Sequence, residues 1–347
     1  MTRRLAACLI AATGLSIGAC AHAPRQSAVR LDAIRRAHVW APTDVRAMDM
    51  MAGPAGSGAF ATNTTVTCDY VEKAMSGRSP KFACAITPDD EVKVKYGRDN
   101  GEVFAEVAAS RLFWALGFGA DRMYPVGVVC RGCPTSIVGS DVAAIERKMA
   151  GTEIESDIES GWAWRELNLV DPLMGGASTA ERDALTLLAV FVQHTDSKAV
   201  QQRLLCISTD ANDSDGAPCA ETFMMVQDVG RTFGHATLSN GNGTESTDLA
   251  AWALTPIWKD PVRCVANMRK SATGTLRNPV IREEGRRFLA DLLVQLTDRQ
   301  LHDLFDVARF TQRLAVPNHH TVATTIAQWV EAFKRKRDEI VNHTCPG

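Results

Sequence analysis

Two carboxylates stand beside apolar segments in the middle of the chain, and their surroundings predict one shared site. An apolar run over residues 180–192 leads into a polar segment with four side chains that could do chemistry. These are His194, Asp196, Lys198 and Gln201. A second, shorter apolar run ends at Asp228. Carboxylates presented at the ends of packed elements can hold a metal ion and accept a proton beside a phosphate.

A strand and a helix upstream supply further charged residues. Residues 91–97 alternate as a strand does, which places Lys93 and Lys95 on one face. Residues 101–119 follow as an amphipathic helix with Glu106 near its start. The sequence thus offers a lysine and a glutamate ahead of the two carboxylates.

These segments resemble the protein-kinase superfamily. Residues 194–201, His-Thr-Asp-Ser-Lys-Ala-Val-Gln, resemble its catalytic loop, His-x-Asp-x-Lys-x-x-Asn. Residues 228–230, Asp-Val-Gly, resemble the metal-binding Asp-Phe-Gly motif, and residues 92–95, Val-Lys-Val-Lys, resemble the Val-Ala-Ile-Lys of the third strand. The motifs stand in the family's order over roughly residues 63–234, and the resemblance is to the atypical, HipA-like or secreted branches.

The resemblance implies a phosphotransferase that uses ATP and Mg²⁺. Lys95 would hold the α- and β-phosphates and pair with Glu106. Asp196 would accept the proton of the attacking hydroxyl, and Lys198 would steady the γ-phosphate. Asp228 would bind Mg²⁺ through hard oxygen ligands.

The chain also departs from the family's pattern at three places. Gln201, at the second-metal position, replaces asparagine and is one methylene longer. Lys93, in the nucleotide groove, stands where the family keeps a small residue, so it would crowd an adenine or redirect nucleotide binding. The turn at residues 76–80 lacks a clear glycine triad over the phosphates.

The same residues allow structural interpretations. Asp196 could cap a turn, and Asp228 could belong to a plain strand-end turn. Lys93 and Lys95 could form a solvated strand face, and His194 could pack to orient its loop. The alternative function is therefore a catalytically inactive kinase-like module that binds a partner in the cell envelope.

The remaining elements predict an α+β fold with a kinase-like, two-lobed layout. Strands are predicted at residues 65–72, 81–86, 91–97, 123–130 and 141–149, the last of which also fits a helix. Helices are predicted at residues 161–173, 180–192, 280–296, 297–310 and 324–341. A β-rich N-lobe would span residues 63–150 and a helical C-lobe residues 151–347.

The N-terminus has the features of an export signal. Two arginines precede an apolar run over residues 5–19, which is too short to span a bilayer. The run ends at Cys20 in a lipobox-like context, although cleavage after Ala23 also fits. We expect residues 1–19 to be a signal peptide, residues 20–62 a tether and lead-in, and Cys20 to carry a lipid anchor. The protein would then face the periplasm from the outer membrane.

Eight cysteines remain after Cys8 and Cys20, and an exported protein uses an even number as disulfides. Nearest-neighbour pairing predicts Cys68–Cys84, Cys130–Cys133, Cys206–Cys219 and Cys264–Cys345. The Cys130–Cys133 motif also leaves a metal or redox role open. The composition is 46% hydrophobic and 22% charged with net charge −2, which is typical of a globular protein and does not indicate nucleic-acid binding.

Overall fold

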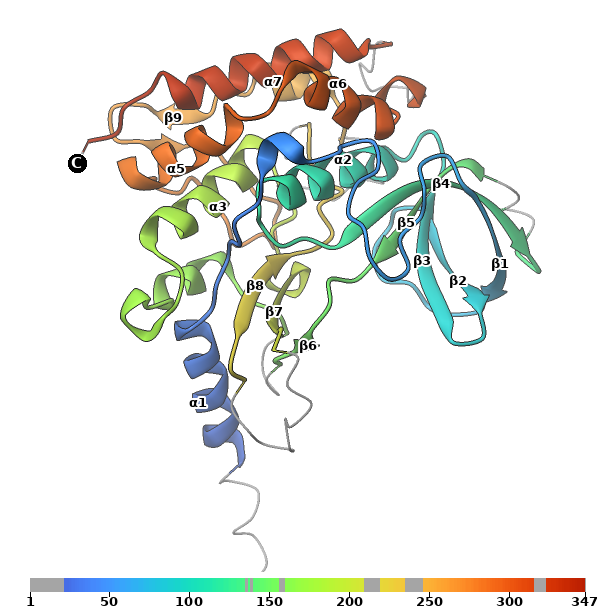
Figure 1. Ribbon diagram of the computed structural model, residues 1–347, viewed down its shortest axis with the longest axis horizontal. Coiled ribbons are helices and arrows are strands. Elements are labelled where there is room, and N and C mark those ends of the chain that lie inside the picture. Colours follow the sequence, from blue (N-terminus) through green and yellow to red (C-terminus); the bar gives the residue numbers. More distant parts are fainter. Residues whose placement is uncertain are drawn as a thin grey trace, which may run out of the picture.

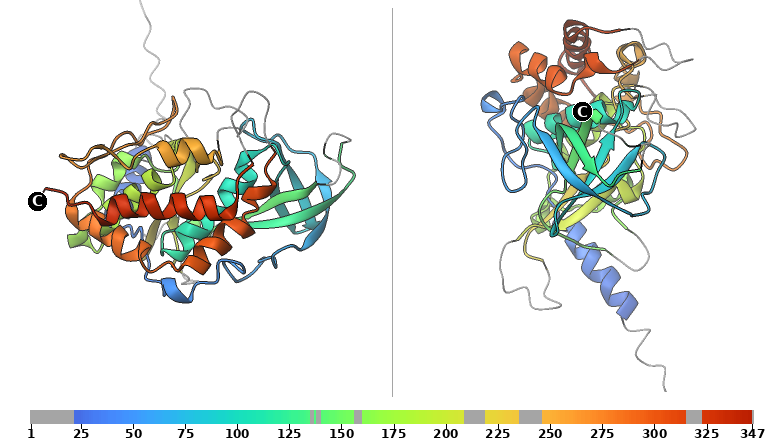
Figure 2. Two further views of the ribbon diagram at one scale, coloured as in Figure 1. Left: turned by 90° about the horizontal axis from the view of Figure 1, so that it is seen from above. Right: turned by 90° about the vertical axis from the view of Figure 1, so that its right-hand side faces the viewer.

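The computed structural model describes residues 22–134, 137, 140–155, 160–208, 219–234, 246–314 and 323–346. The fold is mixed α+β, as the sequence predicts. A strand barrel lies at one end of the molecule and the C-terminal helices lie at the other (Figure 1). The left view of Figure 2, from above, shows the same separation, with the C-terminal helices toward one end and the barrel strands at the other. Within the described residues, no helix is long and apolar enough to cross a membrane.

Five strands close into a barrel in the order β1-β2-β3-β5-β4. They are β1 Thr65–Val71, β2 Lys81–Thr87, β3 Asp90–Tyr96, β4 Arg122–Arg131 and β5 Ser140–Arg147. Val92 and Val94 point into the barrel core, because alternate residues of β3 face opposite sides. Residues 141–149, which the sequence predicted as a strand but which also fitted a helix, contain strand β5, and this strand pairs with β3 and β4.

Helix α2, Gly101–Ala115, joins the barrel to the rest of the molecule. It begins after Asn100, whose side chain accepts a hydrogen bond from the backbone N–H of Glu102. Every residue from Gly101 to Phe113 is buried, since β4 and β5 cover one part of the helix and helix α6 covers another. The predicted amphipathic pattern is therefore wrong, and the main core continues across the predicted boundary at residue 150.

The C-terminal half is mainly helical. Its helices are α3 Thr179–Phe191, α4 Leu249–Leu254, α5 Glu283–Leu293, α6 Asp298–Val307 and α7 Ile326–Val341. Capping boxes at Ser178, Thr297 and Thr325 start α3, α6 and α7. The predicted helix at residues 161–173 is instead two 3-10 turns, η3 Trp164–Leu169 and η4 Pro172–Met174.

Short strands carry the loops that hold the candidate residues. A three-stranded sheet contains β6 Thr152–Glu153, β7 Gln202–Cys206 and β8 Thr222–Val226, and a second sheet contains β9 Trp258–Asp260 and β10 Val265–Ala266. The 3-10 turn η5, Ala199–Gln201, leads directly into β7. Strands β7 and β8 pair antiparallel, with Gln202 at the start of β7 opposite Val226 at the end of β8. The loop before β7 and the loop after β8 therefore lie side by side at the same end of the two strands.

The segment predicted as a tether is packed chain over most of its length. Helix α1, His22–Arg35, contributes Ile34 to the main core, and Arg30 forms an ion pair with Glu166 at 2.7 Å. His38 forms a bridge to Phe223 of β8. The predicted tether over residues 20–62 is thus corrected from α1 onward, while Cys20 and the signal peptide lie outside the described residues.

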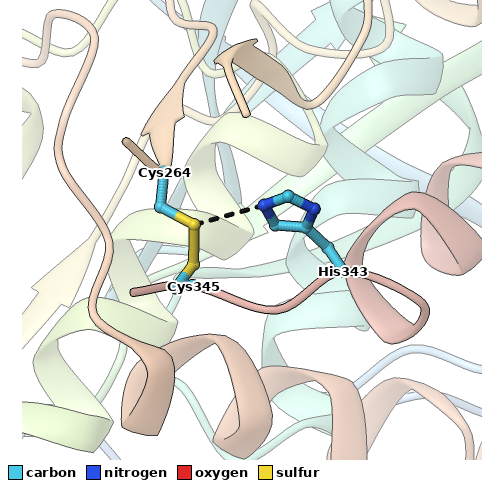
Figure 3. A group of neighbouring side chains, drawn as sticks. All are labelled: Cys264, His343 and Cys345. Atoms are coloured by element: carbon cyan, nitrogen blue, oxygen red, sulfur yellow. Dashed lines mark hydrogen bonds between the residues drawn. A yellow bond between two sulfur atoms is a disulfide. The ribbon is translucent and has the colours of Figure 1, made fainter. Parts of the chain in front are cut away.

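The eight cysteines pair as nearest-neighbour pairing predicts. Cys68 and Cys84 are diagonal neighbours rather than directly opposite, because Tyr70 faces Cys84 across the β1–β2 pair. Cys264 and Cys345 join the β9–β10 region to the C-terminal segment. His343 lies beside this bond, with its Nε2 atom 3.2 Å from Cys264 Sγ (Figure 3). The two sulfurs are bonded to each other, so this group is a disulfide rather than a set of thiolate metal ligands.

Candidate active site

A cavity of about 680 Å³ lies between the β1–β2 turn and the loops at the edge of β7 and β8. Its walls include Lys93, Asp196, Lys198, Gln201 and Asp228. The sequence predicted each of these as a candidate site residue. The structure therefore brings together side chains that lie as far as 135 positions apart in the sequence.

Lys95 lies beneath the cavity and is almost fully buried. Its ammonium Nζ is 2.7 Å from Glu106 Oε2, 2.7 Å from Asp228 Oδ1 and 3.2 Å from Glu102 Oε2. Burial lowers the pKa of Lys95, but the three carboxylates raise it well above its ordinary value. Lys95 is thus a fixed cation, and its predicted contact with Glu106 is present.

Glu102 is a partner of Lys95 that the sequence analysis missed. It stands one helical turn before Glu106, so both carboxylates project from the same side of α2. Glu102 Oε1 also accepts a hydrogen bond from Arg231 Nε at 3.2 Å, which joins α2 to the loop after β8. The spacing of four residues was the available signal. Burial raises the pKa of Glu106 to about 7 although Lys95 opposes the shift.

Asp228 stands at the turn after β8 with φ of 51°, a left-handed conformation that aspartate tolerates. A third of its side chain is exposed to the cavity. Burial raises the pKa of this carboxyl, but Lys95 and Lys93 outweigh burial and hold the pKa well below its usual range. Gly230 is required two residues later, because a Cβ there would lie 2.9 Å from the Cβ of Glu102.

Hydrogen bonds from Lys198, Gln201 and Ser271 hold Asp196 in place. Its Oδ2 atom accepts from Lys198 Nζ and from Gln201 Nε2, both at 3.1 Å. Its Oδ1 atom accepts from the hydroxyl of Ser271 at 3.1 Å. Ser271 was not predicted, because it lies 75 positions away and nothing in its local sequence marks it. These donors fix the carboxylate at the cavity wall.

Gln201 lies between the two aspartates. Its amide nitrogen donates to Asp196 Oδ2 and to Asp228 Oδ2, the second at 2.9 Å. Its buried Oε1 atom has no hydrogen-bond partner among the described residues. The site thus offers two carboxylates, which share one amide N–H group, and one amide oxygen without a hydrogen-bond partner among the described residues. Oxygen ligands of this kind fit a hard divalent cation. The residues present thus fit the Mg²⁺ site that the sequence implied at Asp228 and Gln201.

Lys93 lines the cavity and forms an ion pair with Glu146 of β5. The pairing follows from the register of β3 and β5, which sets these two residues opposite each other. Glu146 raises the pKa of Lys93 even though burial lowers it. The interpretation of Lys93 and Lys95 as a solvated strand face is therefore wrong.

The β1–β2 turn covers the cavity in place of a glycine triad. Ser76, Gly77, Arg78 and Ser79 all line it, followed by Lys81 at the start of β2. Gly77 has φ of +83°, and a Cβ at this position would lie 2.8 Å from the Nζ atom of Lys81. A single glycine thus lets the lysine ammonium lie under the turn. Neither Arg78 nor Lys81 was predicted.

His194 packs beneath the loop, in agreement with its predicted structural role. The imidazole is completely buried, and its ring centre lies 6.5 Å from that of Trp164. Neither ring nitrogen has a hydrogen-bond partner among the residues described. Burial lowers the pKa of His194 to about 4, so the ring is neutral at neutral pH.

His194 is expected to make stability fall on acidification. The unfolded chain binds a proton below the ordinary pKa of 6.5, whereas the folded protein binds it only near pH 4. The stability that this difference provides is complete above pH 6.5 and is lost between pH 6.5 and 4, by at most about 3 kcal/mol. Urea unfolding of the wild type and His194→Gln at pH 7 and pH 4.5 measures it. If the free energy of unfolding fell equally in both proteins between pH 7 and pH 4.5, His194 would not be the cause of the fall.

The sequence matches no family model and no curated protein. Among solved structures, the crystal structure of the Helicobacter pylori proinflammatory kinase CtkA is similar in overall fold, with a TM-score of 0.42 and 10% sequence identity. The alignment covers 81% of this chain and 95% of that chain. A likeness this coarse places no individual residue of the site.

Proposed function

We propose that the chain is a metal-dependent phosphotransferase with a kinase-like, two-lobed fold. The observation that supports this most strongly is the convergence of Lys95, Asp196 and Asp228 around one cavity. They come from a barrel strand, the loop after α3 and the turn after β8. Gln201 links the two aspartates, and Glu106 holds the lysine. A cation, a positioned base and a metal-binding carboxylate are what transfer of a phosphoryl group requires.

Each group has a separate role in this proposal. Asp196 accepts the proton of the attacking hydroxyl, since it faces the cavity with its orientation fixed by Ser271. Lys198 and Lys95 provide positive charge for the phosphate oxygens. Glu106 and Glu102 keep Lys95 in place from α2. Mg²⁺ at Asp228 and Gln201 would neutralise phosphate charge when bound.

We also propose that the protein works outside the cytoplasm, held at the outer membrane by a lipid on Cys20 and facing the periplasm. The four disulfides support an oxidising compartment, because such bonds persist there and are rare where thiols stay reduced. The phosphate acceptor would then be a protein or other component of the envelope.

A second function, an inactive kinase-like module that binds an envelope partner, is favoured by one observation. Both oxygens of Asp228 already accept hydrogen bonds, from Lys95 and from Gln201. A metal ion would have to compete with Lys95 and with the amide nitrogen of Gln201 for these oxygens. In an inactive module these bonds are permanent, and Asp228 serves only to hold the loops together.

Thermal unfolding with Mg²⁺ and ATP separates the two functions. The active enzyme is expected to gain about 3 °C in unfolding temperature at ligand concentrations near a hundred times Kd. Asp228→Ala should abolish this gain, because it removes the carboxylate that holds the metal. Asp306→Ala, an exposed aspartate on α6, is the control and should keep it. No gain with any phosphate donor would favour the inactive module.

A further inference from the structure

Basic side chains outnumber acidic ones in the lining of the cavity. Five basic side chains face it, together with three carboxylates. The basic residues are Arg78, Lys81, Lys93, Lys198 and Arg231, and the acidic residues are Glu102, Asp196 and Asp228. Lys95 adds a further ammonium beneath the wall, in contact with Asp228. This is a distribution of charge that suits a ligand with several negative charges close together.

Residues with apolar side chains are few in the same lining. Among the described residues of the lining, Val200 and Ala272 are the only ones with an aliphatic hydrocarbon side chain, and none is aromatic. Val200 lies on the η5 turn and is 58% exposed. A purine or pyrimidine ring is usually held between apolar or aromatic faces, with a few polar groups at its edge. The described lining provides phosphate-binding groups but no such pair of faces.

Ion pairs lie beside Lys93, on the side of β5 and β7. The Lys93–Glu146 ion pair spans β3 and β5, and Arg203 of β7 forms an ion pair with Asp121. Asp121, Arg203 and Glu146 are all at least nine-tenths buried. Burial and the nearby Glu146 together raise the pKa of Asp121 to about 6, so the two pairs are close enough to interact. Inserting a base here would require separating buried ion pairs.

We propose that the cavity binds its phosphate donor through the phosphate chain alone and does not recognise a nucleobase. The donor class is a linear polyphosphate anion, whether inorganic or carried by a nucleotide of any base. This inference rests on the proposed function and specifies its donor.

Lys81 has a specific role in this proposal. Its ammonium lies under Gly77 at the cavity roof, and no carboxylate among the described residues forms an ion pair with it. Burial lowers the pKa of Lys81, and the nearby Lys95 lowers it further. A phosphate oxygen would relieve this crowding of like charges. Lys81 therefore binds a donor phosphate without serving as a partner to any acidic group of the site.

Competition binding with Mg²⁺ tests the proposal on the wild-type protein. Inorganic tripolyphosphate, ATP, GTP and CTP are expected to bind with Kd values within about threefold of one another, because each offers the same triphosphate. Adenosine should not compete. If ATP binds at least about tenfold more tightly than tripolyphosphate, the inference is overturned and the phosphotransferase function remains. If none of the four anions binds, both proposals fail.

Two variants make the test specific. Lys81→Met is expected to weaken tripolyphosphate and ATP equally, by about tenfold, since it removes one charged hydrogen bond to phosphate. Lys259→Met, an exposed lysine on β9, is the matched control and should change neither. Binding of tripolyphosphate that is unaffected in Lys81→Met, or does not depend on Mg²⁺, would show non-specific attraction and contradict the proposed site.

A third variant opens the region behind Lys93. Lys93→Ala/Glu146→Ala removes both members of one ion pair, so no buried charge loses its partner within that pair. We expect ATP to bind more tightly relative to tripolyphosphate, by about fivefold, once a base has space to enter. If the folded double variant bound ATP and tripolyphosphate with the same ratio of Kd values as the wild type, the argument that this ion pair excludes the base would be contradicted. Circular dichroism checks folding, and the wild-type comparison stands by itself if the variant does not fold.

Discussion

Asp196→Asn is expected to lower the rate of phosphoryl transfer about a thousandfold, since removing a general base typically costs between 10² and 10⁴ in rate. The asparagine amide has nearly the same size and its oxygen can still accept a hydrogen bond from Ser271. It cannot take up the proton of the attacking hydroxyl. Single-turnover kinetics with labelled donor measure the transfer step, and the affinity for the donor should change little.

The controls for this variant separate chemistry from positioning. Ser271→Ala removes only the hydrogen bond to Asp196 Oδ1 and should reduce the rate much less than Asp196→Asn. Asp306→Asn lies on the exposed side of α6 and should leave the rate unchanged. If Asp196→Asn transferred phosphate as fast as the wild type, the assigned base would be incorrect.

Lys95→Met is expected to destabilise the protein by about 3–5 kcal/mol, the usual cost of removing one partner from a buried ion pair. Lys95 is the shared cation of Glu102, Glu106 and Asp228, and it is 1% exposed. Methionine has a similar length but provides no charge, so Glu106 would be left buried with like-charged neighbours. Urea unfolding at pH 8 measures the loss, because Glu106 is then ionised in the wild type and, without Lys95, must either stay charged and unpaired or take up a proton.

A second substitution identifies the cause of this loss. Lys95→Met/Glu106→Met removes the most buried carboxylate together with the lysine, and should regain about 1–2 kcal/mol relative to Lys95→Met. Lys73→Met breaks an exposed ion pair with Glu91 and should cost less than about 1 kcal/mol. A double variant no more stable than Lys95→Met would show that packing, rather than the unpaired charge, causes the destabilisation.

The contacts that could be predicted from the sequence are those fixed by periodicity and motif order. Lys93 and Lys95 share a face because side chains alternate along a strand, and the structure places Lys93 in the cavity wall and Lys95 beneath it, in contact with Asp228. Glu106 follows on the next helix, close enough in the chain for its position to be inferred. Asp196 and Asp228 each follow an apolar element, and β7 and β8 bring the two loops together.

The contacts that could not be predicted depend on tertiary packing. Ser271 reaches Asp196 from a loop without regular structure, so no periodicity indicates it. Arg231 binds Glu102 only because the turn after β8 packs against the start of α2. Burial of α1 was also missed, since the polar residues of its sequence gave no clear apolar face. Ile34 nevertheless packs in the main core, where distant segments provide the partners.

The burial of α2 on every side has a consequence for regulation. A helix with one free face can swing outward and carry its glutamate away from the lysine, which gives an enzyme an off state. Here such a rotation would expose apolar residues now packed against both the barrel and α6, at about 25 cal/mol for each Å². Separating Lys95 from Glu106 by such a movement would therefore be costly, and control of the proposed activity would have to act through ligand access or through the loops around Asp196 and Asp228.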